Sequence, residues 1–332
     1  MTPQEQAALY VENGIRYFEQ GEFQLAIDCY DLALALRPDD PEANFNKGVA
    51  LDNLGKWQAA ITSYDLALAL RPDLPEAHYN KGNTLTKLGE LQAAITSYDL
   101  ALALRPDDPK AHFNKGVALA ELGEWQAAIT SYDLTLALRP QYPKALFNKG
   151  VALGNLGEWQ AAITSYDLAL ALRPDYPEAH HNKGVALAGL KAWQAAITSY
   201  DLALTLRPDF PEAHYGKGAA LFNLQRYPQS LQSAEKALFF NPVLAGAWHL
   251  LGKNQLHLKQ PAEAQRAFER FLLLRAEGEN RDFLSTLDHY RTQFDAPLLV
   301  DWLLAKQAPE LALLPRYTGW WNDIRQQHQD DF

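Results

Sequence analysis

The stretch WQAAITSYDLALALRPD, residues 57–73, decides the fold because the chain contains it several times. It returns unchanged at residues 159–175, and with one or two changes at residues 91–107, 125–141 and 193–209. Near-verbatim repetition is typical of repeat architectures, in which every unit packs against a copy of itself. The spacing between the copies therefore defines the structural unit.

Three kinds of residue mark a period of 34 along most of the chain. Glycine recurs at every thirty-fourth position from Gly14 to Gly252. In most units an alanine follows this glycine by twelve residues, and a tyrosine follows the alanine by four. A proline closes each unit from Pro38 to Pro242. A period of this length indicates stacked supersecondary units rather than a globular core.

Each period is predicted to form two helices joined by a tight turn. In residues 41–74, Pro41 suits the first turn of a helix, where a missing N–H costs nothing. Gly55 allows the chain to reverse, and the second helix ends before Pro72. That helix carries one apolar stripe at helical spacing: Trp57, Ala60, Ile61, Tyr64, Ala67 and Leu68. One pair cannot bury this stripe alone, so the units are expected to stack into an α-solenoid.

These glycine, alanine, aromatic and proline positions resemble the signature of the tetratricopeptide repeat (TPR) family. The resemblance implies an all-α fold, a right-handed TPR superhelix of helix-turn-helix repeats with C-terminal capping helices. Eight units are expected, at residues 7–40, 41–74, 75–108, 109–142, 143–176, 177–210, 211–244 and 245–278. Beyond them we expect capping helices at residues 279–308 and a Trp-containing tail at residues 309–332.

Composition limits the classes of function. The chain has 40 acidic against 30 basic residues, so a basic face for a nucleic-acid backbone is not expected. Its one cysteine, Cys29, excludes an intramolecular disulfide and a multi-thiolate metal site. No apolar stretch looks long enough to span a bilayer, and the first residues lack signal-peptide features. We therefore expect a cytoplasmic protein with no nucleic-acid partner and no membrane insertion.

No arrangement of residues predicts catalysis. The histidines at His78, His112, His180 and His214 share one register, yet equivalent positions in stacked helices lie about 10 Å apart, too far to share a zinc ion. They are expected to pack between helices. The aspartate series that includes Asp65 is expected to face solvent, and the arginine series that includes Arg71 to complement helix C-termini or, alternatively, to bind phosphate. The protein is expected to be no enzyme and to need no metal or cofactor.

A second stripe, on the first helix of each unit, is the candidate binding surface, because in TPR proteins the corresponding positions line a concave groove that holds a partner peptide. Two ladders lie on this stripe. One consists of Asn46, Asn80, Asn114, Asn148 and Asn182, and the other of Phe45, Tyr79, Phe113, Phe147, His181 and Tyr215. An asparagine amide offers a donor and an acceptor, so a row of them could pair with the backbone of an extended peptide.

The asparagine ladder is similar to that of the TPR superhelix of O-GlcNAc transferase, and this resemblance implies peptide threading. The aromatic ladder would add apolar contacts. In an alternative interpretation, the asparagines bond the neighbouring repeat and order the superhelix. Both interpretations can hold at once.

A narrower hypothesis is the carboxylate clamp of TPR co-chaperones, which grips the C-terminal carboxylate of a partner. Its five positions are occupied here by Tyr79, Asn83, Asn114, Lys144 and Asn148, of which three match. The clamp's first lysine and its arginine are absent, so strong carboxylate capture is not expected. Lys87 and Lys110, together with Lys144, still predict a basic middle of the groove.

The sequence therefore predicts a non-catalytic protein–protein interaction scaffold that binds an extended peptide or protein segment in the concave groove. The alternative is a self-assembling structural or oligomerisation module, or an accessory assembly factor for a larger complex. Near-identical units favour this alternative because they can stack across chains as a homo-oligomer.

Overall fold

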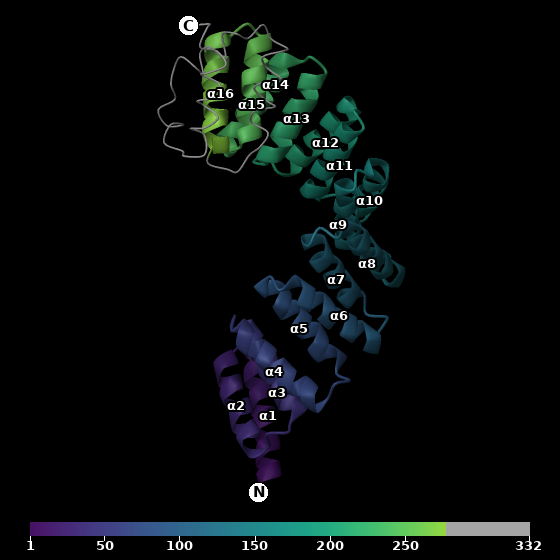
Figure 1. The fold of residues 1–332 in the computed structure, drawn as a ribbon, viewed down its shortest axis with the longest axis vertical. Helices are drawn as coiled ribbons and strands as arrows, with labels where there is room; N and C mark the ends of the chain where they lie inside the picture. The colour runs from purple at the N-terminus through teal and green to yellow at the C-terminus, as the bar shows by residue number, and fades with distance from the viewer. Residues whose placement is uncertain (277–332) are drawn as a thin grey trace, which may run out of the picture. The chain divides into compact units, whose positions relative to one another are not determined.

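A computed structural model describes residues 1–276, and the capping helices and tail expected at 279–308 and 309–332 lie outside them. The described residues form sixteen helices and no strand (Figure 1). They are α1 (Pro3–Glu19), α2 (Phe23–Leu36), α3 (Pro41–Asn53), α4 (Trp57–Leu70), α5 (Pro75–Leu88), α6 (Leu91–Leu104), α7 (Pro109–Glu121), α8 (Trp125–Leu138), α9 (Pro143–Asn155), α10 (Trp159–Leu172), α11 (Pro177–Gly189), α12 (Trp193–Leu206), α13 (Pro211–Asn223), α14 (Tyr227–Phe240), α15 (Ala245–His257) and α16 (Pro261–Ala276). Each of these helices is too short or too polar to cross a lipid bilayer.

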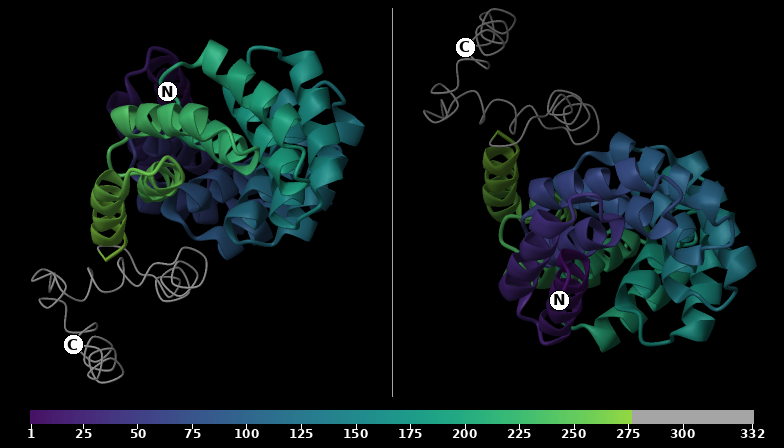
Figure 2. Two further views of the ribbon diagram at one scale, coloured as in Figure 1. Left: turned by 90° about the horizontal axis from the view of Figure 1, so that it is seen from above. Right: turned by 90° about the horizontal axis from the view of Figure 1, so that it is seen from below.

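The chain divides into two units, Met1–Leu190 with α1–α11 and Lys191–Phe332 with α12–α16. Within the first unit, helices pack as pairs in chain order, from α1 with α2 to α9 with α10, and each pair also packs against the next (Figure 2). In the second unit α13 pairs with α14, and α15 pairs with α16. The all-α solenoid of repeated helix-turn-helix units is therefore confirmed.

Local chemistry sets where the helices begin and turn. Proline opens most of the first helices, and Asp40 caps α3 by accepting hydrogen bonds from the N–H groups of Glu42 and Ala43 at 2.9 and 3.1 Å. The turn within a pair has a left-handed residue, such as Gly55 with φ +72°. At the same register later in the chain stand Lys191, Gln225 and Lys259, with φ 58° to 59°. Non-glycine residues adopt this conformation at a cost, so these later turns are strained.

The predicted stripe of the second helix forms the core. In α4, the side chains of Ala60, Ile61, Tyr64 and Ala67 are buried. The glycine of the first helix makes room for the tyrosine, because an ideal Cβ on Gly48 would lie 2.6 Å from Cε1 of Tyr64. The 34-residue recurrence of glycine is therefore a recurrence of this close helix–ring contact.

Each histidine of this series, on a first helix, contacts the backbone just after the end of the preceding second helix. The Nε2 atoms of His78, His112, His180 and His214 lie 2.8–3.0 Å from the carbonyl oxygens of Pro72, Pro106, Pro174 and Pro208. Trp248 makes the same contact through its Nε1 to Pro242 O at 2.8 Å. Within residues 1–276, no three His, Cys, Asp or Glu side chains gather as a metal site would need. The histidines thus pack between helices, as predicted.

Replacing His214 with leucine is expected to remove part of the acid sensitivity of the second unit. Burial lowers the pKa of His214 below 6.5. Lys236 and Lys217 lower it further, whereas the hydrogen bond to Pro208 and the charge of Asp201 act in the opposite direction. A base with a lowered folded-state pKa costs stability as the pH falls below 6.5 towards that pKa, since the unfolded chain then binds the proton better. The loss of unfolding free energy that His214 causes at acidic pH should reach about 1 kcal/mol for each unit by which its pKa is lowered.

Urea unfolding of the wild type and His214→Leu at pH 8 and pH 5.5 measures this difference. Leucine is a suitable replacement because Leu146 already occupies this register in another repeat and is buried there. The wild type should lose more stability than the variant between the two pH values. An equal loss in both proteins would show that His214 does not titrate on unfolding.

Candidate functional site

The first helices keep one half-exposed face, and the two predicted ladders lie on it. In α3, Ala43 and Leu51 are buried, whereas Phe45, Asn46 and Val49 are only half buried. Equivalent residues of α5, α7 and α9 follow the same pattern, whereas in α11 Val185 is exposed and Leu187 is half buried. A ligand in contact with this face would therefore meet amide and aromatic side chains from successive repeats.

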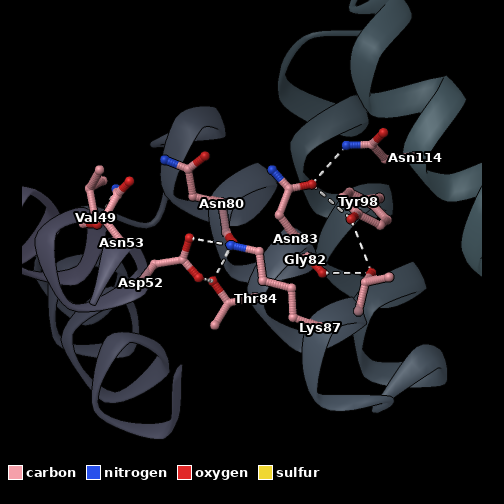
Figure 3. A network of polar contacts seen from close by, with 11 residues as sticks. Val49, Asp52, Asn53, Asn80, Gly82, Asn83, Thr84, Lys87, Tyr98 and Asn114 are labelled. Atoms are coloured by element: carbon pink, nitrogen blue, oxygen red, sulfur yellow. Dashed lines mark hydrogen bonds and ion pairs between the residues drawn. The ribbon is translucent and has the colours of Figure 1, made fainter. Parts of the chain in front are cut away.

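A pocket of about 430 Å³ opens on this face between α3, α5 and α7 (Figure 3). Its polar lining consists mainly of Asp52 and Asn53 from α3, Asn80, Asn83, Thr86 and Lys87 from α5, and Asn114 from α7. The structure thus brings together four of the predicted site residues: Asn80, Asn83, Lys87 and Asn114. Three consecutive repeats contribute to one site.

At one end of the pocket, a carboxylate neutralises the lysine. Lys87 donates from Nζ to Oδ2 of Asp52 at 2.6 Å, and Thr84 donates from Oγ1 to Oδ1 of Asp52 at 2.9 Å. Both bonds link the third repeat back to the second. The basic character expected from Lys87 is therefore cancelled within the pocket by Asp52.

At the other end, an amide network links the third repeat to the fourth. Asn114 donates from Nδ2 to Oδ1 of Asn83 at 2.8 Å and to the hydroxyl of Tyr79 at 3.0 Å. The hydroxyl of Tyr98 also donates to Oδ1 of Asn83, at 2.9 Å. Asn114 therefore bonds the neighbouring repeat, as the alternative interpretation of the ladder expected.

The side-chain amide of Asn80 makes no hydrogen bond with the residues that the structure describes, and it projects over the pocket between the two networks (Figure 3). Its donor and acceptor are thus available to a ligand. The Asp52–Lys87 pair on one side and the Asn83–Asn114 pair on the other hold the surrounding side chains in place. The pocket is polar, and the amide of Asn80 lies between the two bonded networks.

The aromatic ladder packs mainly on the buried tyrosines. The rings of Phe45, Tyr79, Phe113 and Phe147 lie 5.9–6.1 Å from those of Tyr64, Tyr98, Tyr132 and Tyr166. Phe113 and Phe147 are also covered by Tyr142 and Tyr176, at 4.9 and 4.8 Å. Each ring is therefore only partly exposed on this face.

The remaining predicted residues lie outside the main pocket. Asn182 lines a second pocket of about 210 Å³ between α9 and α11, and a hydrogen bond from Asn148 opposes the rise that burial causes in the pKa of Tyr132. Lys110 and Lys144 are exposed in the first turns of α7 and α9. His181 is half buried on α11, and Tyr215 packs beside Gly246 in the second unit.

Sequence reasoning missed the two threonines of the site. Residues 82–87 read GNTLTK, where the corresponding stretches of neighbouring repeats read GVALDN and GVALAE. Thr84 is fully buried and bonds Asp52, and Thr86 contacts the hydroxyl of Tyr98 at 3.2 Å. The departure from the repeat pattern was the signal that marks this pocket.

The aspartates expected to face solvent are half exposed, but each is paired with a lysine sixteen residues later. In the first unit the pairs are Asp31–Lys47, Asp65–Lys81, Asp99–Lys115, Asp133–Lys149 and Asp167–Lys183, with N–O distances of 2.5–2.6 Å. Each pair joins a second helix to the first helix of the next repeat. Exposed ion pairs add little stability, so their main effect is to cancel charge between repeats.

Comparisons with protein-family models agree with the helical repeat fold described above. Family models described as TPR repeat match residues 82–123, 116–157, 155–191 and 190–225, and one described as Tetratricopeptide repeat matches residues 14–79. These matches cover more than half of the chain. No curated protein matches the chain significantly.

Several solved structures resemble the chain. The MamA protein is 26% identical, with a TM-score of 0.50 over 51% of this chain and 93% of its own. YrrB, described as a TPR protein with an unusual peptide-binding site, is 22% identical, with a TM-score of 0.53 over 57% of this chain and 97% of its own. A tetratricopeptide repeat protein from Parabacteroides merdae is 16% identical, with a TM-score of 0.55 over 76% of this chain and 99% of its own.

Proposed function

Because the chain belongs to the tetratricopeptide repeat family, whose fold serves in general as a protein-interaction scaffold, we propose that it binds an extended segment of another protein across its first helices. The pocket between α3, α5 and α7 is the centre of the proposed site. The observation that carries this proposal is the amide of Asn80, which has no partner among the described residues and faces a pocket built from three repeats.

Stacking of the repeats does not need these polar side chains. The neighbouring repeats have Val49 or Val117 where α5 has Asn83, and Ala50 or Ala118 where α5 has Thr84. Those repeats pack in the same way with apolar residues at these positions. Polar groups that packing does not require are typical of a binding site, where they fix the orientation of a ligand.

An extended peptide fits the chemistry of the pocket. Its backbone presents alternating N–H and C=O groups, and a carboxamide such as that of Asn80 can bond both kinds. The carboxylate of Asp52 already holds the ammonium group of Lys87, so the pocket favours an uncharged backbone over a free C-terminal carboxylate. The YrrB description names a peptide-binding site in that protein, which is the same class of ligand.

The test replaces Asn80, Asn114 and Asn148 together with alanine. Peptides selected by phage display on the wild type serve as ligands, and fluorescence anisotropy gives their dissociation constants. The amide of Asn80 can lose one donated and one accepted hydrogen bond, each worth about 0.5–1.5 kcal/mol, so the triple variant should bind at least about fivefold more weakly. Amidating the C-terminus of the peptide should leave the affinity unchanged.

Asn223→Ala is the matched control, because the amide of Asn223 donates to Ala219 O of its own helix at 2.8 Å. Circular dichroism must show that the triple variant keeps its helices. Unchanged affinity in a folded triple variant would refute the groove proposal. A large loss on amidation would instead identify a carboxylate clamp.

A further inference from the structure

The second helices are apolar on two faces, although packing covers only one. The fourteen residues of α4 include a single charge, Asp65. Opposite its buried face, α4 carries an exposed stripe at helical spacing: Ala59, Thr62, Leu66, Ala69 and Leu70. A helix that is apolar all round is normally buried all round. The outer face of α4 therefore behaves like a surface that another molecule covers.

The same face recurs along the first unit. The residues at the register of Leu66 are 46–53% exposed: Leu32, Leu66, Leu100, Leu134 and Leu168. The residues at the register of Leu70 are 40–44% exposed: Leu36, Leu70, Leu104, Leu138 and Leu172. We call these ten side chains the leucine face. Exposed apolar patches that extend over several elements mark interaction surfaces.

The polar groups around the leucine face are already satisfied. The hydroxyl of Thr62 donates to Gln58 O of its own helix at 3.1 Å, and Thr96, Thr130 and Thr164 bond their own helices in the same way. The hydroxyls of these exposed threonines are therefore already bonded within their own helices. Asp65 is paired with Lys81 at 2.5 Å. From α4 to α10 the outer face presents methyl groups and cancelled charge.

The fold itself does not require leucine at these positions. In the second unit, the register of Leu66 is still leucine on α12 (Leu202), but it is Lys236 on α14 and Arg270 on α16, and both charged residues are exposed. Those helices form and pair as the others do. The five leucines at the register of Leu66 thus serve something other than helix formation or stacking, whereas the register of Leu70 stays apolar as Leu206 and Phe240.

We propose that the leucine face of residues 1–190 binds the leucine face of a second copy of this chain. Rows of leucine recur on the face once per repeat, and a second copy has the same rows at the same spacing. The cancelled charge of the face gives a strongly charged partner nothing to bind, and it removes local repulsion between like copies. This interface is distinct from the proposed peptide groove, which lies on the first helices.

The experiment uses the full chain in analytical ultracentrifugation over a wide range of concentration. The wild type is expected to form a concentration-dependent dimer. Leu66→Lys, Leu100→Lys and Leu134→Lys combined, which repeat the lysine found at this register in Lys236, place three charges per copy in the interface. Because buried unpaired charges are costly, the dissociation constant of the dimer should rise at least about a hundredfold.

The matched control carries Gln4→Lys, Gln20→Lys and Asn155→Lys, which add the same number of charges at exposed positions of first helices or their ends, away from the second helices. It should remain a dimer, as should the triple asparagine variant of the groove. If the lysine variant fails to keep its helices by circular dichroism, Leu→Gln at the same three positions replaces it.

A wild type that stays monomeric at every concentration would overturn the proposal, and so would a folded lysine variant that still dimerises. Flotation with neutral phosphatidylcholine vesicles tests whether the leucine face binds lipid instead. A monomeric wild type that co-floats with these vesicles, together with loss of flotation in the lysine variant, would show that the face binds lipid and not a second copy.

Discussion

Raising the pH above 10 is expected to unfold the first unit steeply. Five tyrosines of this unit are 1–3% exposed: Tyr30, Tyr64, Tyr98, Tyr132 and Tyr166. Burial raises the pKa of Tyr30 to about 12, and it raises the pKa values of the other four above the ordinary value of 10. The ring of each packs against the glycine of its own repeat, so ionisation would place a charge inside the helix pair.

Stability should fall as the pH rises, because the unfolded chain releases the tyrosine protons more readily than the folded protein. An acid whose folded-state pKa is raised keeps its full contribution to stability below pH 10 and loses it as the pH rises towards the folded-state pKa. Each buried tyrosine then costs about 1.4 kcal/mol per pH unit, so five together cost about 7 kcal/mol per unit. Since domains are stable by about 5–15 kcal/mol, unfolding is expected within about two units above pH 10.

Circular dichroism of the helices and the ultraviolet absorbance of tyrosinate, recorded together during a pH titration, check this expectation. The chain has 15 tyrosines, so part of the absorbance change can precede unfolding, but the part that comes from these five should appear only as helix is lost. Tyr166→Phe removes one ionisable group from the core and should reduce the slope of stability against pH by about 1.4 kcal/mol per unit. Tyrosinate formation from these five rings in a fully helical protein would contradict the proposed cause.

The fold could be predicted because the same residues recur at the same positions in almost every repeat. Glycine, tyrosine and proline at fixed intervals identify both helices and their contact, and the structure shows Gly48 against Tyr64 as that contact. The histidine packing followed from spacing, although its acceptor, such as the carbonyl of Pro72, did not. Residues 279–332, where a cap and a tail are predicted, remain a prediction.

The candidate pocket was only half visible in the sequence. Equal register places Asn80 and Asn114 on one face, but register does not say whether an amide meets solvent or the next repeat. That depends on the distance between first helices, which lets Asn114 reach Asn83 at 2.8 Å and leaves Asn80 without a described partner. The Asp52–Lys87 bond joins residues 35 apart and needs the same information.

The leucine face was hidden for a different reason. In a helix with apolar residues on both sides, periodicity identifies two stripes and does not rank them. Tyr64 and Leu66 both look like core residues in the pattern, yet Tyr64 is 1% exposed and Leu66 is 53% exposed. Only the position of the paired first helix decides which stripe is covered. An apolar helix can therefore hide a binding surface within an apparent core pattern.

Replacing Gly150 with alanine is expected to destabilise the protein, whereas the same change at Gly154, one turn later in α9, is expected to stabilise it. An ideal Cβ on Gly150 would lie 2.5 Å from Cε1 of Tyr166, closer than packed atoms come. The nearest atom to a Cβ on Gly154 is Cζ3 of Trp159 at 3.7 Å, an ordinary contact. Ala120 and Ala188 already occupy the register of Gly154 in other repeats.

The two changes share one chemistry and one helix, so their difference isolates packing. Alanine favours a helix over glycine by about 0.8–1 kcal/mol, which should appear almost fully at Gly154. At Gly150 overpacking costs about 1–3 kcal/mol or more, because the Tyr166 ring is held by Phe147 at 5.9 Å and cannot move away freely. We expect Gly150→Ala to cost about 2 kcal/mol net in urea unfolding.

A double-mutant cycle tests the cause. Tyr166→Leu removes the ring that meets the new methyl group, so Gly150→Ala should be much less destabilising in that background, with a coupling energy of about 1–2 kcal/mol. Gly154→Ala should show little coupling to Tyr166→Leu, since a Cβ there would lie 3.7 Å from Trp159 and 3.9 Å from the Tyr166 hydroxyl, both ordinary contacts. An equal cost of Gly150→Ala in both backgrounds would mean that the glycine serves the backbone rather than the ring. The recurring spacing of glycine and tyrosine would then need another explanation than the contact between them.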